Sequence, residues 1–257
     1  IGTDSIKNNF DSANVYDHNK NRTIPFRLNM TGGTTIQFWL KKDSFDASKT
    51  KKEVILDLWN GEQSGSDDYG RLILELCTTA SNIPALRLSM ASGSHSFLDQ
   101  GISLSTYDAT AFASSTWTHH TITLKSSNQK MSVDYYKNGL LDKSNEFDTG
   151  LTFYEIPGVI NSYIGALQTS SVESTYWGGT YNQTFMKGAG KLAASMDDFR
   201  FWKKDLNAEY IYNTWFDSIG GGSNTDDSRN DLGVYYKFNE GIVGNSDFDS
   251  IVLDYSG

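Results

Sequence analysis

Carboxylates are the side chains of this sequence that could carry out glycoside hydrolysis, so their spacing is informative. Such an enzyme needs two carboxyl groups facing one cleft, about 5 Å apart for retention or somewhat more for inversion. Glu53 and Asp57 share the parity of one predicted strand, but Ile55 lies between them and indicates a core face. Asp197 and Asp198 are adjacent, so on a strand they point to opposite sides. The spacing therefore predicts a protein that is not an enzyme, with a glycanase as the residual alternative.

Other reactive side chains are also poorly arranged for catalysis. Cys77 is the single cysteine and lies in an alternating strand pattern, where a small buried thiol is expected. The four histidines show no metal-ligand spacing, and we expect His119 to be a hydrogen-bonded sheet residue near Trp117. The sequence has no Gly-x-Ser-x-Gly elbow, phosphate loop or dinucleotide fingerprint. These patterns favour binding over catalysis.

An aromatic-rich polar segment, Gln168–Gly188, is the strongest candidate for ligand contact. It carries Tyr176, Trp177 and Tyr181 among Gly, Ser and Thr, which offer no periodic core for the rings to join. Exposed Tyr and Trp side chains stack on sugar rings or anchor protein interfaces. The alternative is a loop folded back over a sheet edge with its rings buried. We predict that Tyr176, Trp177 and Tyr181 bind the ligand.

The elements that must position these residues are mostly strands. Apolar residues recur with period two in short runs separated by Gly, Ser, Asp and Asn. Asn138-Gly139 is a strong hairpin signal, because both residues accept the positive φ of a tight turn. The predicted strands are Thr35–Lys41, Glu53–Trp59, Arg71–Cys77, Ala85–Met90, Trp117–Leu124, Met131–Lys137, Ser162–Ala166, Ala194–Trp202 and Gly233–Phe238.

One segment, Ala208–Phe216, has a helical pattern, with Asn207 as its N-cap and Gly220–Gly222 after its end. Many strands with so little helix between them must pair antiparallel, because parallel strands need long crossovers. The sequence therefore predicts an all-β fold with one short helix near 207–217.

Composition excludes two partner classes. The chain has 257 residues, with 31 acidic against 22 basic side chains and a formal charge of −9. An acidic surface repels phosphate backbones, so we expect no nucleic acid partner. No apolar run approaches the roughly 18 residues of a membrane span, so we expect no membrane insertion.

Several segments, in this order, resemble laminin-G-like jelly rolls of the concanavalin A-like lectin/glucanase superfamily. They are TIQFWLK at Thr35–Lys41, Trp117-Thr118-His119, VDYYKNG at Val133–Gly139, YIGA at Tyr163–Ala166 followed by MDDFRFW at Met196–Trp202, and YYKFNEG at Tyr235–Gly241 followed by DYSG at Asp254–Gly257.

The resemblance implies a two-sheet antiparallel jelly-roll sandwich over residues 31–257. We expect residues 1–30 to be a junction segment, since Phe10-Asp11-Ser12 echoes Phe248-Asp249-Ser250, and the chain to be part of a longer multidomain protein. The alternative is a chance repeat of three common residues. The glucanase branch carries its acids as Glu-x-Asp-x-Glu on one strand, and this sequence lacks that triplet.

Calcium is the cofactor that the resemblance suggests, because laminin-G-like and pentraxin relatives often hold Ca²⁺ in loops at one rim. Carboxylates in flexible loops are suitable hard ligands. The pairs Asp67-Asp68 and Asp226-Asp227 lie in Gly-, Ser- and Asn-rich loops. The alternative, favoured by the lack of EF-hand-like spacing, is that these are solvated loop residues bonded to their own backbone.

Together, these features predict a non-catalytic recognition or structural module of a virion or cell-surface protein, such as a bacterial adhesin. Its expected partner is a glycan or a neighbouring protein subunit, and its expected location is extracellular or on a virion. A glycoside hydrolase or lyase of the same fold, and a purely architectural subunit that forms homo-oligomers, remain alternatives.

Overall fold

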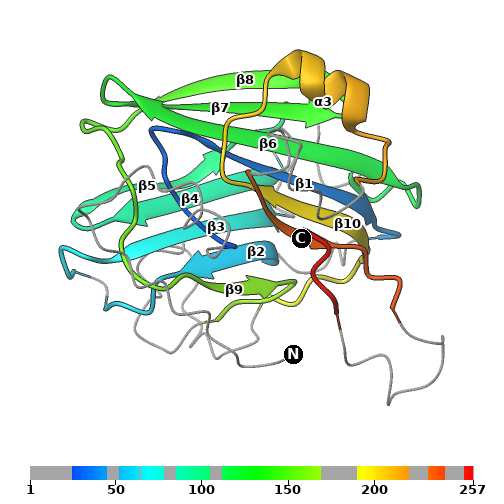
Figure 1. Ribbon diagram of the computed structural model, residues 1–257, viewed down its shortest axis with the longest axis horizontal. Helices are drawn as coiled ribbons and strands as arrows, with labels where there is room; N and C mark the ends of the chain where they lie inside the picture. The colour runs from blue at the N-terminus through cyan, green and yellow to red at the C-terminus, as the bar shows by residue number, and fades with distance from the viewer. Residues whose placement is uncertain are drawn as a thin grey trace.

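The protein is a sandwich of two antiparallel β-sheets, as a computed structural model shows (Figure 1). The structure describes residues 25–44, 52–63, 65–77, 85–104, 112–168, 190–219, 231–240 and 252–256. One sheet is six-stranded, in the order β11-β10-β1-β6-β7-β8, and the other is five-stranded, in the order β5-β4-β3-β2-β9. The predicted all-β jelly-roll class is confirmed.

The strands lie where the sequence predicts them, with β5 and β8 as additions. The six-stranded sheet contains β1 (Thr34–Lys41), β6 (Thr118–Ser127), β7 (Lys130–Lys137), β8 (Leu140–Asp148), β10 (Ser195–Trp202) and β11 (Leu232–Tyr236). The five-stranded sheet contains β2 (Lys52–Trp59), β3 (Gly70–Cys77), β4 (Leu86–Ser92), β5 (His95–Gly101) and β9 (Asn161–Ile164).

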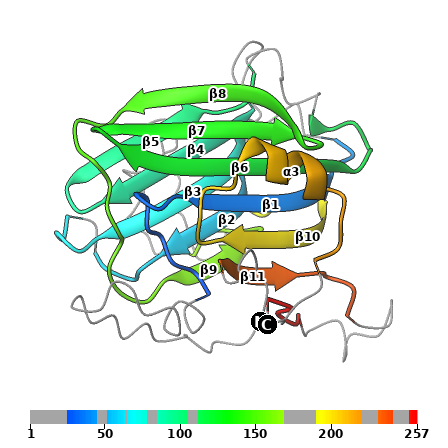
Figure 2. The ribbon, with the colours of Figure 1, turned by 45° about the horizontal axis from the view of Figure 1, so that its top comes forward.

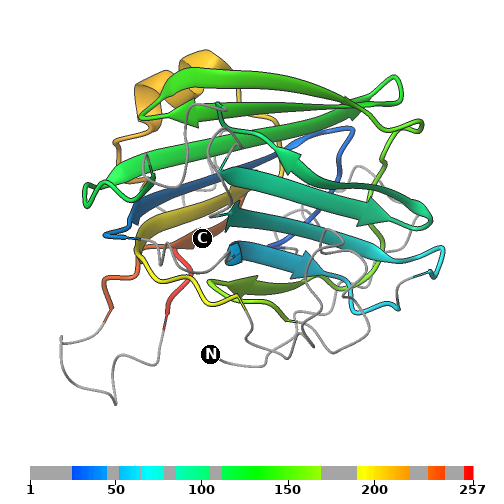
Figure 3. The ribbon, with the colours of Figure 1, turned by 180° about the vertical axis from the view of Figure 1, so that it is seen from behind.

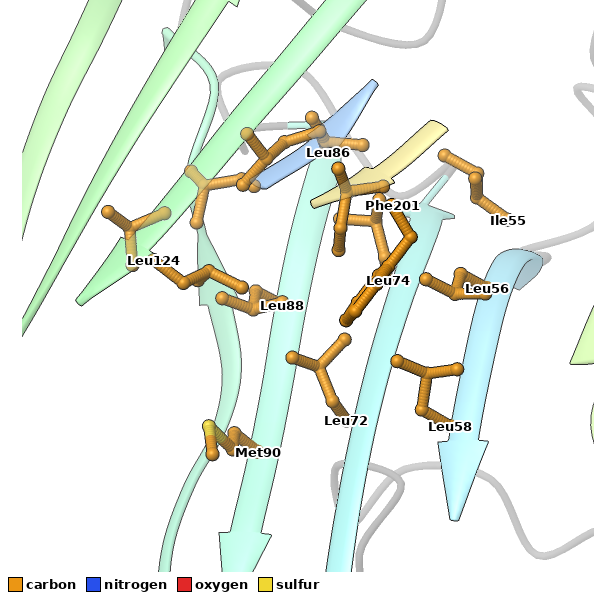
Figure 4. Packing of buried hydrophobic residues seen from close by; sticks show 14 of the residues in the cluster. Ile55, Leu56, Leu58, Leu72, Leu74, Leu86, Leu88, Met90, Leu124 and Phe201 are labelled. Atoms are coloured by element: carbon orange, nitrogen blue, oxygen red, sulfur yellow. The ribbon is translucent and has the colours of Figure 1, made fainter. Parts of the chain in front are cut away.

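Alternate side chains of the two sheets meet in one hydrophobic core. In Figure 4, Leu72 and Leu74 of β3 lie beside leucines of β2 and β4, with Leu124 of β6 and Phe201 of β10 opposite. Every residue of β3 is buried, including Cys77, as predicted for that thiol. Burial on both sides means that the outer face of the five-stranded sheet is not open to solvent at its centre.

Strand β2 contains a β-bulge that the sequence did not predict. Its register with β3 shifts between Val54 and Leu56, so Ile55 and Leu56 both enter the core. Directly paired residues share one face of a sheet. Glu53 pairs with the core residue Leu76 and therefore faces inward, whereas Asp57 pairs with Ile73 and faces outward.

The shared core face expected for Glu53 and Asp57 is therefore wrong. One extra residue reverses the side-chain parity of everything beyond it. The inward Glu53 is neutralised by Lys42, whose Nζ lies 3.0 Å from Oε1 and 2.8 Å from Oε2. Lys42 follows β1, so this buried ion pair joins the two sheets.

The Asn138-Gly139 hairpin is confirmed between β7 and β8. Both residues have positive φ, 49° and 77°. The Asn138 side-chain oxygen accepts a hydrogen bond from the His119 backbone N–H at 2.9 Å. A Cβ at Gly139 would lie 2.2 Å from Cδ1 of Trp215, so the turn packs tightly against the residue that follows the short helix.

That helix, α3 (Ala208–Thr214), is confirmed, as is its N-cap, because Asn207 Oδ1 accepts a hydrogen bond from Tyr210 N at 2.8 Å. Figure 2 shows α3 over the outer face of the six-stranded sheet. Its buried Ile211 packs there in a second apolar cluster with Trp202 and Tyr136. Helix α3 thus covers part of this outer face.

Residues 25–30, within the predicted junction segment, contribute Phe26, Leu28 and Met30 to the main core. At the other end, Asp254 lies alongside β11, where its Oδ1 accepts from Tyr235 N at 2.9 Å. The boundary at residue 30 stays a prediction. In the described part of the chain, no helix is long and apolar enough to cross a membrane.

The adjacent His119 and His120 of β6 face opposite sides of their sheet. His119 lies on the outer face, with ring contacts to Trp39 and Trp215 and its Nδ1 3.5 Å from Thr121 Oγ1. His120 lies in the interior, where its Nδ1 is 2.8 Å from the Tyr135 hydroxyl. Burial lowers the pKa of each histidine from 6.5 to about 3.

Replacing His120 with Phe should make stability less dependent on pH. Between pH 6.5 and about 3, the unfolded chain binds a proton at His120 and the folded chain does not. This contribution to stability is complete above pH 6.5 and decreases on acidification, by up to about 1.4 kcal/mol per pH unit. Urea unfolding at pH 7, 5 and 4 gives the slope of the unfolding free energy against pH for each protein. Equal slopes for wild type and variant would contradict a buried neutral imidazole.

Gly139→Ala should destabilise the fold more than the matched change Gly150→Ala. Both glycines have positive φ, 77° and 70°, so each alanine costs about 1–2 kcal/mol for the left-handed backbone. Gly150 has nothing within 4 Å of its Cβ position, whereas Gly139 meets the Trp215 ring. Denaturant unfolding gives the loss of stability for each variant, and the difference between the two losses is the contribution of the contact with Trp215. Equal losses would show that the turn does not support Trp215.

Candidate functional site

Most residues predicted to bind a ligand lie outside the part of the chain that the structure describes. Tyr176, Trp177 and Tyr181 fall within residues 169–189, and Asp226 and Asp227 fall within residues 220–230. Their predicted roles therefore stay predictions. The described segments that flank residues 169–189 nevertheless show where this loop starts and ends.

Asp67 and Asp68 are exposed in the turn between β2 and β3. The turn is held by its own polar groups: Asp68 N donates to Ser66 Oγ at 3.2 Å, and the Asp68 carbonyl accepts from Asn60 Nδ2 at 2.5 Å. Within the described ranges, no three His, Cys, Asp or Glu side chains are grouped so that they could hold a metal ion. Calcium binding by Asp67 and Asp68, with Asp226 and Asp227, stays a prediction.

The outer face of the five-stranded sheet carries charged side chains at its centre. Asp57 of β2 and Arg71 and Glu75 of β3 point outward and are buried, at 0%, 3% and 0% exposure. Figure 3 shows the two sheets from behind. A buried charge is costly unless it is paired and hydrogen-bonded, so a group of charges here must be held by specific partners.

Asp57 and Arg71 form a bidentate ion pair. Arg71 Nε donates to Asp57 Oδ1 at 2.8 Å, and an Arg71 terminal nitrogen donates to Oδ2 at 2.6 Å. Two parallel charge-assisted hydrogen bonds fix both side chains in one geometry. The Arg71 guanidinium also lies 5.7 Å from the ring centroid of Trp59, within the range of a cation–π contact.

Trp59 is half-buried and borders this ion pair. Its Nε1 donates to the Glu62 carbonyl at 2.9 Å, which fixes the ring. Asn161 of β9 pairs directly with Trp59, and Tyr163 pairs directly with Asp57, so both lie on the same face, and both are half-buried. We define the Trp59 surface as Asp57, Trp59, Arg71, Asn161 and Tyr163.

Both ends of the predicted aromatic loop are attached to β2. Before the loop, Gln168 N donates to Asp57 Oδ2 at 2.9 Å. After the loop, the Gly190 carbonyl accepts from Val54 N at 2.8 Å, and Ala193 N donates to Glu53 Oε2 at 2.9 Å. The described residues on either side of 169–189 are therefore both attached to β2, and Gln168 is bonded to a member of the Trp59 surface.

The acids Asp57 and Asp99 of this face are engaged by neighbouring groups. The oxygens of Asp57 accept from Arg71 and Gln168, and Asp99 of β5 accepts from Arg87 Nε at 2.6 Å. Glu75 pairs in register with Arg87. A hydrolytic site requires one carboxyl held as an acid and a second free to attack or to activate water. The chemistry best supported here is hydrogen bonding and ring stacking.

Sequence reasoning missed Trp59 and Arg71 as site residues. A usable signal was present, because β3 alternates Arg71 and Glu75 with Leu72, Leu74 and Leu76, which indicates one polar face. Trp59 has the parity of Asp57 within β2, beyond the bulge. The pairing of Arg71 with Asp57 depends on which strands are neighbours, and a single strand pattern does not contain that information.

No family model and no curated protein matches the chain. Among solved structures, a putative carbohydrate-binding protein from Bacteroides ovatus is 16% identical, with a TM-score of 0.46; the match covers 88% of this chain and only 50% of that one. A heptameric pentraxin from Limulus polyphemus is 14% identical, with 72% and 70% covered and a TM-score of 0.41. The CBM40 domain of a Ruminococcus gnavus sialidase, bound to α2,6-sialyllactose, is 16% identical, with 72% and 84% covered and a TM-score of 0.38.

These structures are carbohydrate-binding, pentraxin and CBM40 domains. At such identities and TM-scores, the likeness carries no argument about what this chain binds. The jelly-roll class rests on the strand order of the two sheets. Membership of the laminin-G-like or concanavalin A-like group stays a prediction.

Proposed function

We propose that the chain is a non-catalytic recognition module that binds a glycan at the Trp59 surface. The observation that carries this proposal is the half-buried Trp59 ring, held beside a buried Asp57–Arg71 ion pair. Sugars present apolar C–H faces and a rim of hydroxyls, so an indole next to fixed polar groups matches both features. We propose that Tyr176, Trp177 and Tyr181, which follow Gln168 in the sequence, also contact the ligand.

Rigidity supports this assignment. Trp59 is fixed by its hydrogen bond to Glu62, and Asp57 is fixed by Arg71 and Gln168. Side chains that are already ordered lose little conformational entropy when a ligand binds. A preorganised surface of this kind suits the weak, repeated contacts of a module on a cell or virion surface, which is the setting that we propose.

Calcium remains part of the proposal through Asp67, Asp68, Asp226 and Asp227. A glycoside hydrolase or lyase is the less favoured alternative, since Asp57 and Asp99 are engaged by arginines. The solved structures are named as binding carbohydrate or sialyllactose, and those ligands belong to those proteins. The support for a glycan ligand here is the chemistry of the Trp59 surface.

Trp59→Ala should weaken retention on a glycan array or an immobilised oligosaccharide about tenfold, because loss of ring stacking costs on the order of 1.5 kcal/mol. Trp59→Phe keeps a ring and should retain most of the binding. Tyr154→Ala is the matched control, since Tyr154 is a 69% exposed aromatic outside the Trp59 surface. Thermal unfolding shows whether each variant folds, and unchanged retention by folded Trp59→Ala would count against the site.

A second function, contact with a neighbouring subunit, is favoured by an apolar patch on the other sheet. Four large apolar side chains there are each more than half exposed. They are Leu140 and Leu141 at the start of β8, Tyr212 in α3, and Phe216 just after α3. Helix α3 contacts β8, and Gly139 lies against Trp215, which packs on Phe216. We call Leu140, Leu141, Tyr212 and Phe216 the α3 apolar surface.

If the α3 apolar surface mediates self-association, the purified chain should sediment as a defined oligomer at micromolar concentration. The double change Leu141→Ser and Phe216→Ser should then shift it to the monomer, because both residues are exposed and contribute little to the folded core. Analytical ultracentrifugation across a concentration series measures this, and a strictly monomeric wild-type chain would argue against the architectural alternative.

A further inference from the structure

The two arginines of the Trp59 surface and the neighbouring strand β4 are already neutralised by carboxylates. Arg71 is engaged by both oxygens of Asp57, and Arg87 is engaged by Asp99. Glu75 adds a third acid, buried and in register opposite Arg87. Lys52 of β2, in register with Cys77, holds a position of the same parity, so the acidic and basic positions on this face are three each and leave no excess positive charge.

A surface that recognises an anionic ligand needs an excess of positive charge. A carboxylate, sulfate or phosphate is bound most strongly by a guanidinium whose paired N–H groups face the ligand. Here Arg71 directs Nε and a terminal nitrogen at Asp57, at 2.8 and 2.6 Å. An acidic sugar would have to displace a buried carboxylate from its partner, and leaving such a charge unpaired costs several kcal/mol.

Other charges nearby do not reverse this balance. Lys42 is bound to Glu53 between the sheets, away from the outer face. Lys191, in the segment that returns from the loop, is exposed to solvent. A single exposed lysine contributes less than about 1 kcal/mol to a contact with an anion. The chain as a whole carries −9, which repels anions at low ionic strength.

We infer that the Trp59 surface selects neutral glycans and discriminates against sugars that carry carboxylate, sulfate or phosphate groups. This inference rests on the proposed function and specifies its ligand class. The paired Asp57 and Arg71, at 0% and 3% exposure, form a buried and electrically neutral layer beside the Trp59 ring. Discrimination then comes from the carboxylates that already engage Arg71 and Arg87, so an anion forms no new ion pair with either arginine, and from the formal charge of −9 on the chain.

The first test compares matched neutral and acidic glycans by calorimetry or on an array. A neutral oligosaccharide should bind at least tenfold more tightly than its sialylated or sulfated counterpart at 20 mM salt, and the ratio should shrink at 500 mM as charges are screened. Tighter binding of the acidic form, weakening with salt, would overturn the inference and leave the glycan function intact. If neither form binds, the proposed function fails, and the inference fails with it.

The second test uses Asp57→Asn, which leaves Arg71 without its carboxylate. Binding of the acidic glycan should rise severalfold at 20 mM salt and should weaken as salt is added, while binding of the neutral glycan should fall. Glu146→Gln is the matched control, since Glu146 pairs with Lys130 on β8 of the other sheet, and its loss changes the net charge equally. Unchanged preference in a folded Asp57→Asn protein would contradict the role of the ion pair. If that variant does not fold, the salt dependence of the wild-type chain decides.

Discussion

The bulge in β2 is the constraint on which both the core and the candidate site depend. It places Ile55 and Leu56 together in the core, and it turns Glu53 inward while Asp57 turns outward. Without the extra residue, the parity of the strand would place one of the two acids against the wrong surroundings. A single backbone irregularity therefore assigns one carboxylate to inter-sheet structure and the other to the outer face.

The two acids are stabilised in the same way on opposite sides of the sheet. Glu53 and Asp57 are both buried, and both oxygens of each carboxylate accept hydrogen bonds from a cation. Each carboxylate also accepts a hydrogen bond from a backbone N–H: that of Ala193 for Glu53, and that of Gln168 for Asp57. Buried ion pairs contribute little net stability, because desolvation offsets the attraction. Their main effect here is geometric, since they order the chain around β2.

Much of the fold could be predicted because its local signals agree with its long-range packing. Asn138-Gly139 formed the predicted turn, and Asn207 formed the predicted cap, because each requires only neighbouring backbone. Strands β5 and β8 were not predicted, since HSFLDQG and LLDKSNEFD lack clear alternation at sheet edges. The Trp59 surface was not predicted either. Its members come from β2, β3 and β9, and their proximity follows from strand order, which alternation within one strand does not encode.

The attachment of both ends of residues 169–189 to β2 has a consequence for stability. Gln168 and Gly190 are fixed by a side chain and a backbone group of one strand, so the segment between them starts and finishes on the same rigid support. Insertions and deletions between fixed ends change the entropy of closing a loop only slowly, because that entropy depends on the logarithm of the loop length. Changes of length between Gln168 and Gly190 should therefore cost the sandwich little stability, while its core depends on other positions.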